Sequence, residues 1–317
     1  MEARSREESL KMEARTKQLV EAERENLLSQ LSKLIPNFDP SLLKLNTMSQ
    51  IQGQSPKNPM SDKASCSGAL DVRALQFEED TAKNGENQEE MGKAMTFTIE
   101  KEVFGIDRNT FVLHEDISQF AAMEEIGATV VAVYMRCLFD HLKAANMVNM
   151  VGFIDPALIS ADAGSLTERS RIVFSRLQKT DGEQIFLMPY NPSRHWVLII
   201  VRAKKEIVYF LDPLPGNRVV DEEGKNIVNS ALKMYNSHIG RIGHKAPLWK
   251  TLPGTPKQPS SVECGYYVMR FMRDIILDPS LEFEKMFAKG KDQAPYPQAA
   301  IEEVRKEWVE FVCVHME

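Results

Sequence analysis

The chain has 317 residues, of which 43% are hydrophobic and 26% charged, and its formal net charge is −6. Such values are typical of a soluble chain with one or two globular domains. The acidic balance gives no electrostatic argument for direct binding to nucleic acid, and no apolar run approaches the ~18 residues of a membrane span. We therefore weigh an enzyme against a protein-binding module.

The four cysteines (Cys66, Cys137, Cys264 and Cys313) show no paired spacing. This argues against a disulfide framework and against a zinc site, and it favours a reducing compartment. The N-terminus is charged from its first residues, unlike a secretory signal peptide. We therefore expect an intracellular protein that is not secreted.

Two segments precede the region with regular apolar patterns. Residues 1–35 are rich in helix-forming Glu, Arg, Lys, Ala, Leu and Gln. Their turns are mostly polar, so we expect a charged, solvated helix; the alternative is a coiled-coil fragment that mediates self-association. Residues 36–94 are dominated by polar residues, Gly and Pro without apolar periodicity, which predicts a disordered linker.

A folded domain is expected from residue 95 to residue 317. Met95–Ile99 alternates in character and predicts a first strand. Residues 116–145 follow helical spacing, which predicts one long amphipathic helix with Cys137 as a core thiol on its apolar face. Further helices are predicted at 165–178, 221–235 and 297–315, and strands at 184–190, 195–202, 206–211 and 248–250.

Two of these strands carry polar residues at matching ends. His195 opens the apolar run Trp196–Val201, and Asp212 closes the run that begins at Glu206. The few residues between the runs predict an antiparallel hairpin. The start of its first strand then lies beside the end of its second, so we expect the His195 and Asp212 side chains to be neighbours.

A cysteine lies where a later helix begins. The sequence Gln258-Pro259-Ser260-Ser261-Val262-Glu263-Cys264-Gly265 leads into an amphipathic helical pattern. A helix N-terminus favours a thiolate, and Gly265 carries no side chain that would crowd a substrate carbonyl. A nucleophilic thiol requires a base, and the base an orienting group. We therefore expect Cys264, His195 and Asp212 to share one site, with the Gln258 amide turned toward the sulfur.

The order His195, Asp212, Gln258, Cys264 resembles that of the Ulp1-like cysteine proteases, which process ubiquitin-like modifiers such as SUMO. The matching pieces are His-Trp before an apolar strand, Asp after an aromatic-rich strand, and Gln-Pro-x-x-x-Glu-Cys-Gly before a helix. The resemblance covers about residue 95 to the C-terminus. It is greatest to Ulp1-type domains of plant genomes, which are often associated with transposable elements.

The resemblance implies an α+β, papain-like core with a central, mostly antiparallel sheet flanked by helices. It also implies a Cys-His-Asp triad with Gln258 as oxyanion donor, Trp196 and Gly265 against the substrate, no cofactor, and a SUMO-like modifier as partner. The location would be the nucleus or the cytoplasm.

One departure from the family pattern concerns the substrate channel. Many Ulp1-like enzymes carry a Trp-Leu-[Asn/Asp]-Asp motif ahead of the first long helix, whose tryptophan covers the Gly-Gly tail of the modifier. We take 114–120 as the equivalent region, and it contains no tryptophan. The usual lid is therefore absent or replaced, which leaves the identity of the modifier open.

Three alternatives remain. In the first, the same catalytic framework acts on another ubiquitin-like modifier or transfers acyl groups. In the second, the chain is a transposon-derived copy that is catalytically silent and binds a modifier or a host protein. In the third, the chain is a DNA-binding, transposase-associated protein. Retention of all four catalytic-type residues argues against the second alternative. The acidic charge and the lack of a zinc or helix-turn-helix signal argue against the third.

Overall fold

The computed structural model describes residues 94–216, 221–241, 245–288 and 293–315, with seven single positions between residues 18 and 33. Those seven positions are helical. The remainder of 1–35 and the linker predicted before residue 94 lie outside the described residues, as does Cys66. Self-association through 1–35 stays a prediction.

The domain alternates short strands with helices. Its elements are β1 (Met95–Ile99), α4 (Lys101–Phe104), β2 (Arg108–Val112), α5 (His114–Ala121), α6 (Ala128–Ala144), β3 (Val151–Phe153), the 3₁₀ turn η1 (Ala157–Ile159), α7 (Leu166–Leu177), β4 (Ile185–Tyr190), β5 (Val197–Arg202), β6 (Ile207–Leu211), α8 (Glu222–His238), β7 (Leu248–Thr251), α9 (Cys264–Leu277), α10 (Phe283–Met286) and α11 (Gln298–Val314).

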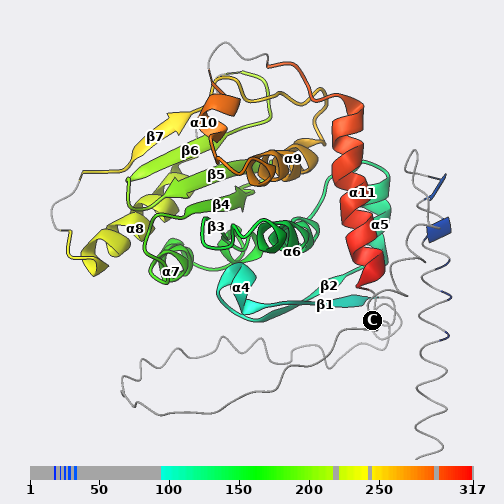
Figure 1. Ribbon diagram of the computed structural model, residues 1–317, viewed down its shortest axis with the longest axis horizontal. Helices are drawn as coiled ribbons and strands as arrows, with labels where there is room; N and C mark the ends of the chain where they lie inside the picture. Colours follow the sequence, from blue (N-terminus) through cyan, green and yellow to red (C-terminus); the bar gives the residue numbers. More distant parts are fainter. Residues whose placement is uncertain are drawn as a thin grey trace, which may run out of the picture.

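A five-stranded sheet in the order β3-β4-β5-β6-β7 forms the centre of the domain (Figure 1). The pairs β4–β5 and β5–β6 are antiparallel, whereas the outer strands β3 and β7 add in parallel. The hairpin predicted for β5 and β6 is present, with Leu198 opposite Leu211. This register brings the residues just before β5 and just after β6 to one end of the sheet.

Helices cover both faces of this sheet, and the strand side chains alternate between them. Phe186, Met188, Ile199 and Val201 pack in one buried cluster with α7 and α8. Leu187, Leu198 and Ile200 pack in the other, with α6, α9 and α11. The chain is thus an α+β protein in which a mixed sheet, antiparallel at its centre, lies between two helical layers, as expected.

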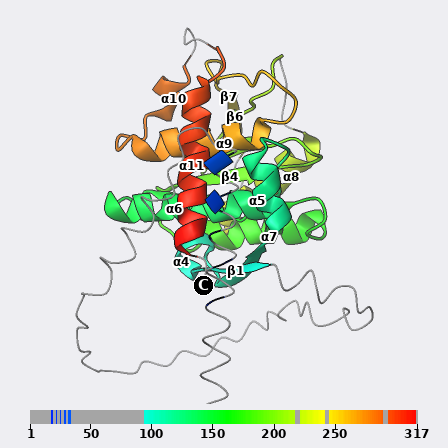
Figure 2. The same cartoon turned by 90° about the vertical axis from the view of Figure 1, so that its right-hand side faces the viewer.

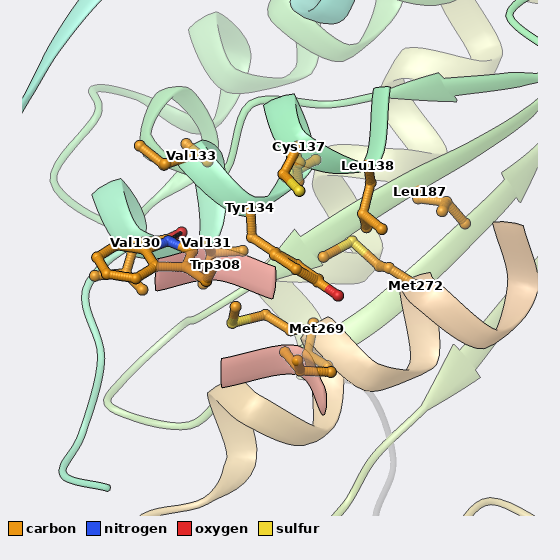
Figure 3. Close-up of a cluster of buried hydrophobic side chains, with 14 of the residues drawn as sticks. Val130, Val131, Val133, Tyr134, Cys137, Leu138, Leu187, Met269, Met272 and Trp308 are labelled. Atoms are coloured by element: carbon orange, nitrogen blue, oxygen red, sulfur yellow. Dashed lines mark hydrogen bonds between the residues drawn. The ribbon is translucent and has the colours of Figure 1, made fainter. Parts of the chain in front are cut away.

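The helical layer that carries α9 is the larger core. Helix α6 is buried along nearly its whole length, from Val130 to Phe139. Trp308 of α11 is fully buried and donates a hydrogen bond from its indole to Val130 O at 3.0 Å. Tyr134 lies between α9 and α11 beside Met269 (Figure 3), and α11 crosses α6 and α9 and contacts both (Figure 2). Cys137 is buried in this core, as predicted.

The single helix expected over 116–145 is two helices, because α5 ends at Ala121 and α6 begins at Ala128. Side chains that are distant in sequence cap the end of α5. The Tyr266 hydroxyl lies 3.1 Å from both Phe120 O and Glu124 O and donates its one hydrogen to this pair of carbonyls, and the Arg305 guanidinium donates to Ala121 O. Carbonyls at a helix end need such partners. The break is therefore set by tertiary contacts.

The sequence did not predict some of the smaller elements that the structure contains. Strand β3 and helices α4 and α10 are too short to give a periodic signal. The sequence at 107–109 predicts a turn, but Arg108 and Asn109 belong to β2. Within the described ranges, no helix combines the length and apolar composition that a membrane crossing requires.

Candidate active site

The imidazole of His195 and the carboxylate of Asp212 meet at the end of the β5–β6 hairpin. His195 Nε2 lies 2.7 Å from Asp212 Oδ1, and that oxygen also accepts a hydrogen bond from Leu214 N at 2.8 Å. The Asp212 side chain is 7% exposed and that of His195 18%. A buried carboxylate held in this way fixes the ring and leaves Nδ1 for a second partner.

The backbone before His195 is also fixed. Arg194 lies in the left-handed region at φ 62°, and His195 N donates to Asn191 Oδ1 at 3.0 Å. A non-glycine residue in that region costs roughly 1 kcal/mol or more and persists where surrounding contacts hold it. The Asn191 bond is one such contact, although Asn191 carried no signal in the sequence.

Cys264 is the first residue of α9 and is 3% exposed. Its thiol is close enough to His195 to influence the pKa of the imidazole. Burial lowers the pKa of His195, but hydrogen bonds to Asp212 and Cys264 and the charges of both groups outweigh burial and raise it to about 9. The structure therefore brings the three side chains together as expected, in an arrangement that favours imidazolium beside an anionic partner.

Gln258 lies in the loop that leads to α9 and is buried, at 3% exposure. Its backbone N–H donates to Pro213 O at 2.7 Å, and its side-chain Nε2 donates to Ser260 O at 2.6 Å. An amide nitrogen has two hydrogens, so one remains for another acceptor. The Oε1 atom is buried without a hydrogen-bond partner among the described residues. Most buried polar atoms in proteins are hydrogen-bonded, so this unpaired oxygen calls for an explanation.

Trp196 and Gly265 form the wall behind the thiol. The Trp196 indole is 3% exposed and donates to Ile126 O at 2.9 Å. A Cβ atom on Gly265 would lie 2.4 Å from Ile126 Cγ1 and 3.2 Å from Trp196 Cδ1. The glycine thus permits close packing of α9 against the segment before α6, a role distinct from the space for substrate that the sequence suggested. Substrate contact by Trp196 or Gly265 stays a prediction.

Gly265→Ala is expected to destabilise the protein, because the added methyl overlaps Ile126. Overpacking of this kind typically costs ~1–3 kcal/mol, which urea unfolding would measure. Gly127→Ala is the matched control, since a Cβ there meets no atom within 4 Å. Equal stability of the two variants would contradict this account of the glycine.

The segment directly ahead of α6 is 122–127, whereas 114–120 forms most of α5. The former lies beside the thiol through the contacts of Ile126. Glu125 Oε2 is 3.4 Å from Arg194 Nη2, and both side chains are largely exposed. With Met123, Glu124 and Val262 they border a cavity of about 500 Å³. The residues that border this cavity include charged and apolar side chains, and no tryptophan is among them.

No group of three or more His, Cys, Asp or Glu side chains that could hold a metal occurs in the part of the chain that the structure describes. A thiol at a helix N-terminus, a base that contacts it and a carboxylate that orients the base are the components of a cysteine peptidase.

Comparison with known proteins gives the family. The model of the Ulp1 protease family, C-terminal catalytic domain, matches residues 124–309, more than half of the chain. The chain therefore belongs to the Ulp1 family of cysteine peptidases. The match includes His195, Asp212, Gln258 and Cys264 and begins in the segment before α6. No curated protein sequence matches the chain.

Several solved structures resemble the domain at low identity. A structure described as the de-sumoylating protease has 12% identity and a TM-score of 0.47, covering 68% of this chain and 91% of its own. A C-terminal Ulp1 protease domain in complex with Smt3, the yeast ortholog of SUMO, has 16% identity, a TM-score of 0.42, and coverage of 72% of this chain and 92% of its own. The Xanthomonas campestris effector XopD bound to ubiquitin has 16% identity, a TM-score of 0.41, and coverage of 57% and 90%.

Proposed function

We propose that the chain is a thiol isopeptidase that cleaves after the C-terminal glycine of a ubiquitin-like modifier of the SUMO type. Cys264 is the nucleophile, His195 the general base and acid, Asp212 the group that orients His195, and Gln258 the oxyanion donor. The observation that carries this proposal is the chain of contacts from Asp212 through His195 to the thiol at the start of α9.

Before the first half-reaction, the proton of the Cys264 thiol passes to His195, so that a thiolate and an imidazolium form the reacting pair. The sulfur then attacks the carbonyl carbon of the modifier's last glycine. The Gln258 amide and the Cys264 backbone N–H donate hydrogen bonds to the negatively charged carbonyl oxygen. A donor of this kind is typically worth ~10²–10³ in rate. The C–N bond breaks, and His195 gives its proton to the departing lysine amine, which leaves a thioester on Cys264.

In the second half-reaction, His195 takes a proton from water, and the resulting hydroxide attacks the thioester carbonyl. The C–S bond breaks, and the thiolate regains its proton from His195. The products are a modifier with a free carboxylate and a target lysine. When the leaving amine belongs to a peptide bond instead, the same steps mature a modifier precursor.

A panel of modifiers tests the proposal. SUMO-type and ubiquitin-type modifiers are prepared with an electrophile in place of the terminal carboxylate, and matched probes lack the last two residues. We expect a covalent adduct with a SUMO-type probe, mapped to Cys264 by peptide mass spectrometry, and cleavage of the corresponding fusion protein. Binding without an adduct would contradict the proposal and favour a silent binding module; an adduct with ubiquitin-type probes alone would overturn the SUMO assignment.

The finer attributions remain predictions. Kinship with plant transposon-associated members and location in the nucleus or the cytoplasm rest on the sequence resemblance. So do the absence of a cofactor and the absence of a direct nucleic-acid partner.

A further inference from the structure

Two hydrogen bonds join the loop before the nucleophile to the residues that follow β6. Lys257 Nζ donates to Asp212 O at 2.8 Å, and Gln258 N donates to Pro213 O at 2.7 Å. The dipeptide 212–213 and the dipeptide 257–258 thus lie side by side, beyond the parallel pair of β6 and β7. One dipeptide carries the carboxylate that orients His195, and the other carries the amide proposed to bind the oxyanion.

Lys257 is an unusual lysine for a polar loop because it is partly buried. Burial lowers its pKa below the ordinary value, and the nearby charge of Asp212 opposes this change. An interaction made by a solvent-exposed lysine contributes little to stability, so removing its partner has a small effect. A half-buried ammonium group bonded to a backbone carbonyl contributes more, because it is partly withdrawn from water.

The backbone carbonyl that Lys257 binds belongs to Asp212 itself. The carboxylate of the same residue accepts from His195 Nε2 and from Leu214 N. A shift of that peptide therefore moves the carboxylate relative to the ring. On the other side, Lys257 is bonded covalently to Gln258, whose side chain is held by Ser260 O. A single side chain thus connects both halves of the site.

We infer that Lys257 is a positioning residue for the proposed reaction. Its ammonium group holds the Asp212 backbone against the Gln258 loop, and this contact fixes the carboxylate and the oxyanion donor relative to each other. The inference rests on the proposed function, because it concerns only the groups that the proposed reaction requires. Lys257 contacts neither the thiol nor the imidazole in any hydrogen bond of the described residues.

Lys257→Met tests the inference, because it keeps the length of the side chain and removes the donor and the charge. Small displacements of catalytic groups can cost up to ~10²-fold in rate, so we expect kcat to fall by about 10- to 100-fold with little change in KM. Lys257→Arg keeps a cation that can donate and is expected to recover much of the loss. Lys205→Met is the control, since Lys205 is exposed in the turn at the opposite end of the hairpin.

A pH profile separates positioning from general support of the fold. The charged partners of the His195 imidazole are Asp212, which follows β6, and Cys264, at the start of α9. Lys257 is a cation next to the first of these. Its removal favours the imidazolium, so the high-pH limb of kcat/KM is expected to move upward in Lys257→Met and to stay in place in Lys257→Arg.

Failure of the Lys257 inference can be distinguished from failure of the proposed function. If the wild-type protein forms no adduct with modifier probes and cleaves no fusion, the proposed function fails, whatever Lys257 does. If the wild type is active and Lys257→Met matches it, the inference alone is overturned. The inference is also overturned if Lys257→Met unfolds, or if both variants lose activity equally with an unshifted profile, because either result would make Lys257 a structural residue.

Discussion

Cys264→Ala is expected to abolish both adduct formation with a modifier probe and cleavage of a modifier fusion. No other side chain at the site is placed to form the thioester, and loss of the nucleophile of a catalytic triad typically costs several orders of magnitude in kcat, up to ~10⁶. The variant should keep its fold, since alanine at the first position of α9 retains helix propensity. Thermal unfolding of both proteins checks this point.

Cys137→Ala is the matched control for the nucleophile. Cys137 is buried in the core, and burial raises the pKa of its thiol to about 12. It is therefore protonated and unreactive at neutral pH. Its replacement is expected to lower stability slightly and to leave the adduct intact. An adduct that persists in Cys264→Ala and disappears in Cys137→Ala would overturn the assignment of the nucleophile.

Asp212→Asn is expected to lower kcat/KM by ~10²–10⁴, because the base loses the anion that orients it and stabilises its charged form. The pH dependence gives a sharper test. Asp212 contributes to raising the pKa of His195 to about 9. In the wild type the imidazolium thus persists up to about pH 9, where the high-pH limb is expected. Removal of the carboxylate lowers this pKa, so the limb moves to lower pH, opposite to the shift expected for Lys257→Met.

The same measurement on Asp162→Asn provides the control, since Asp162 is exposed in the loop after η1. Its profile should overlay that of the wild type. An Asp212→Asn profile with an unmoved high-pH limb would show that another group sets the charge state of His195, and it would remove Asp212 from the proposed triad.

The central part of the site was predictable because its determinants are local. His195 and Asp212 belong to one hairpin whose turn is short, so their proximity follows from strand pairing over a few residues. The start of α9 at Cys264 follows from apolar spacing within a single helix. Patterns within one hairpin or one helix can be recognised in a single sequence because they do not depend on the packing of distant elements.

The remaining features depend on contacts between distant parts of the chain. The end of α5 is set by Tyr266 and Arg305, which lie more than 140 residues further along. Strands β3 and β7 join the sheet through parallel pairing, which needs a crossover and leaves no hairpin signal. Lys257 reads as an ordinary lysine of a polar loop, and only its contact with Asp212 distinguishes it. Gly265 was expected at the site, but the packing that requires it was not.

The origin of the reacting groups in two different layers has a consequence for biosynthesis. The sheet supplies the imidazole and the carboxylate, and α9, which bears the sulfur, packs in one buried cluster with Tyr134 of α6 and Trp308 of α11. Because His195 precedes Cys264 in the chain, synthesis on the ribosome yields the ring before the thiol. A nascent chain that ends before Cys264 lacks the proposed nucleophile, so we expect it to have no thiol-protease activity.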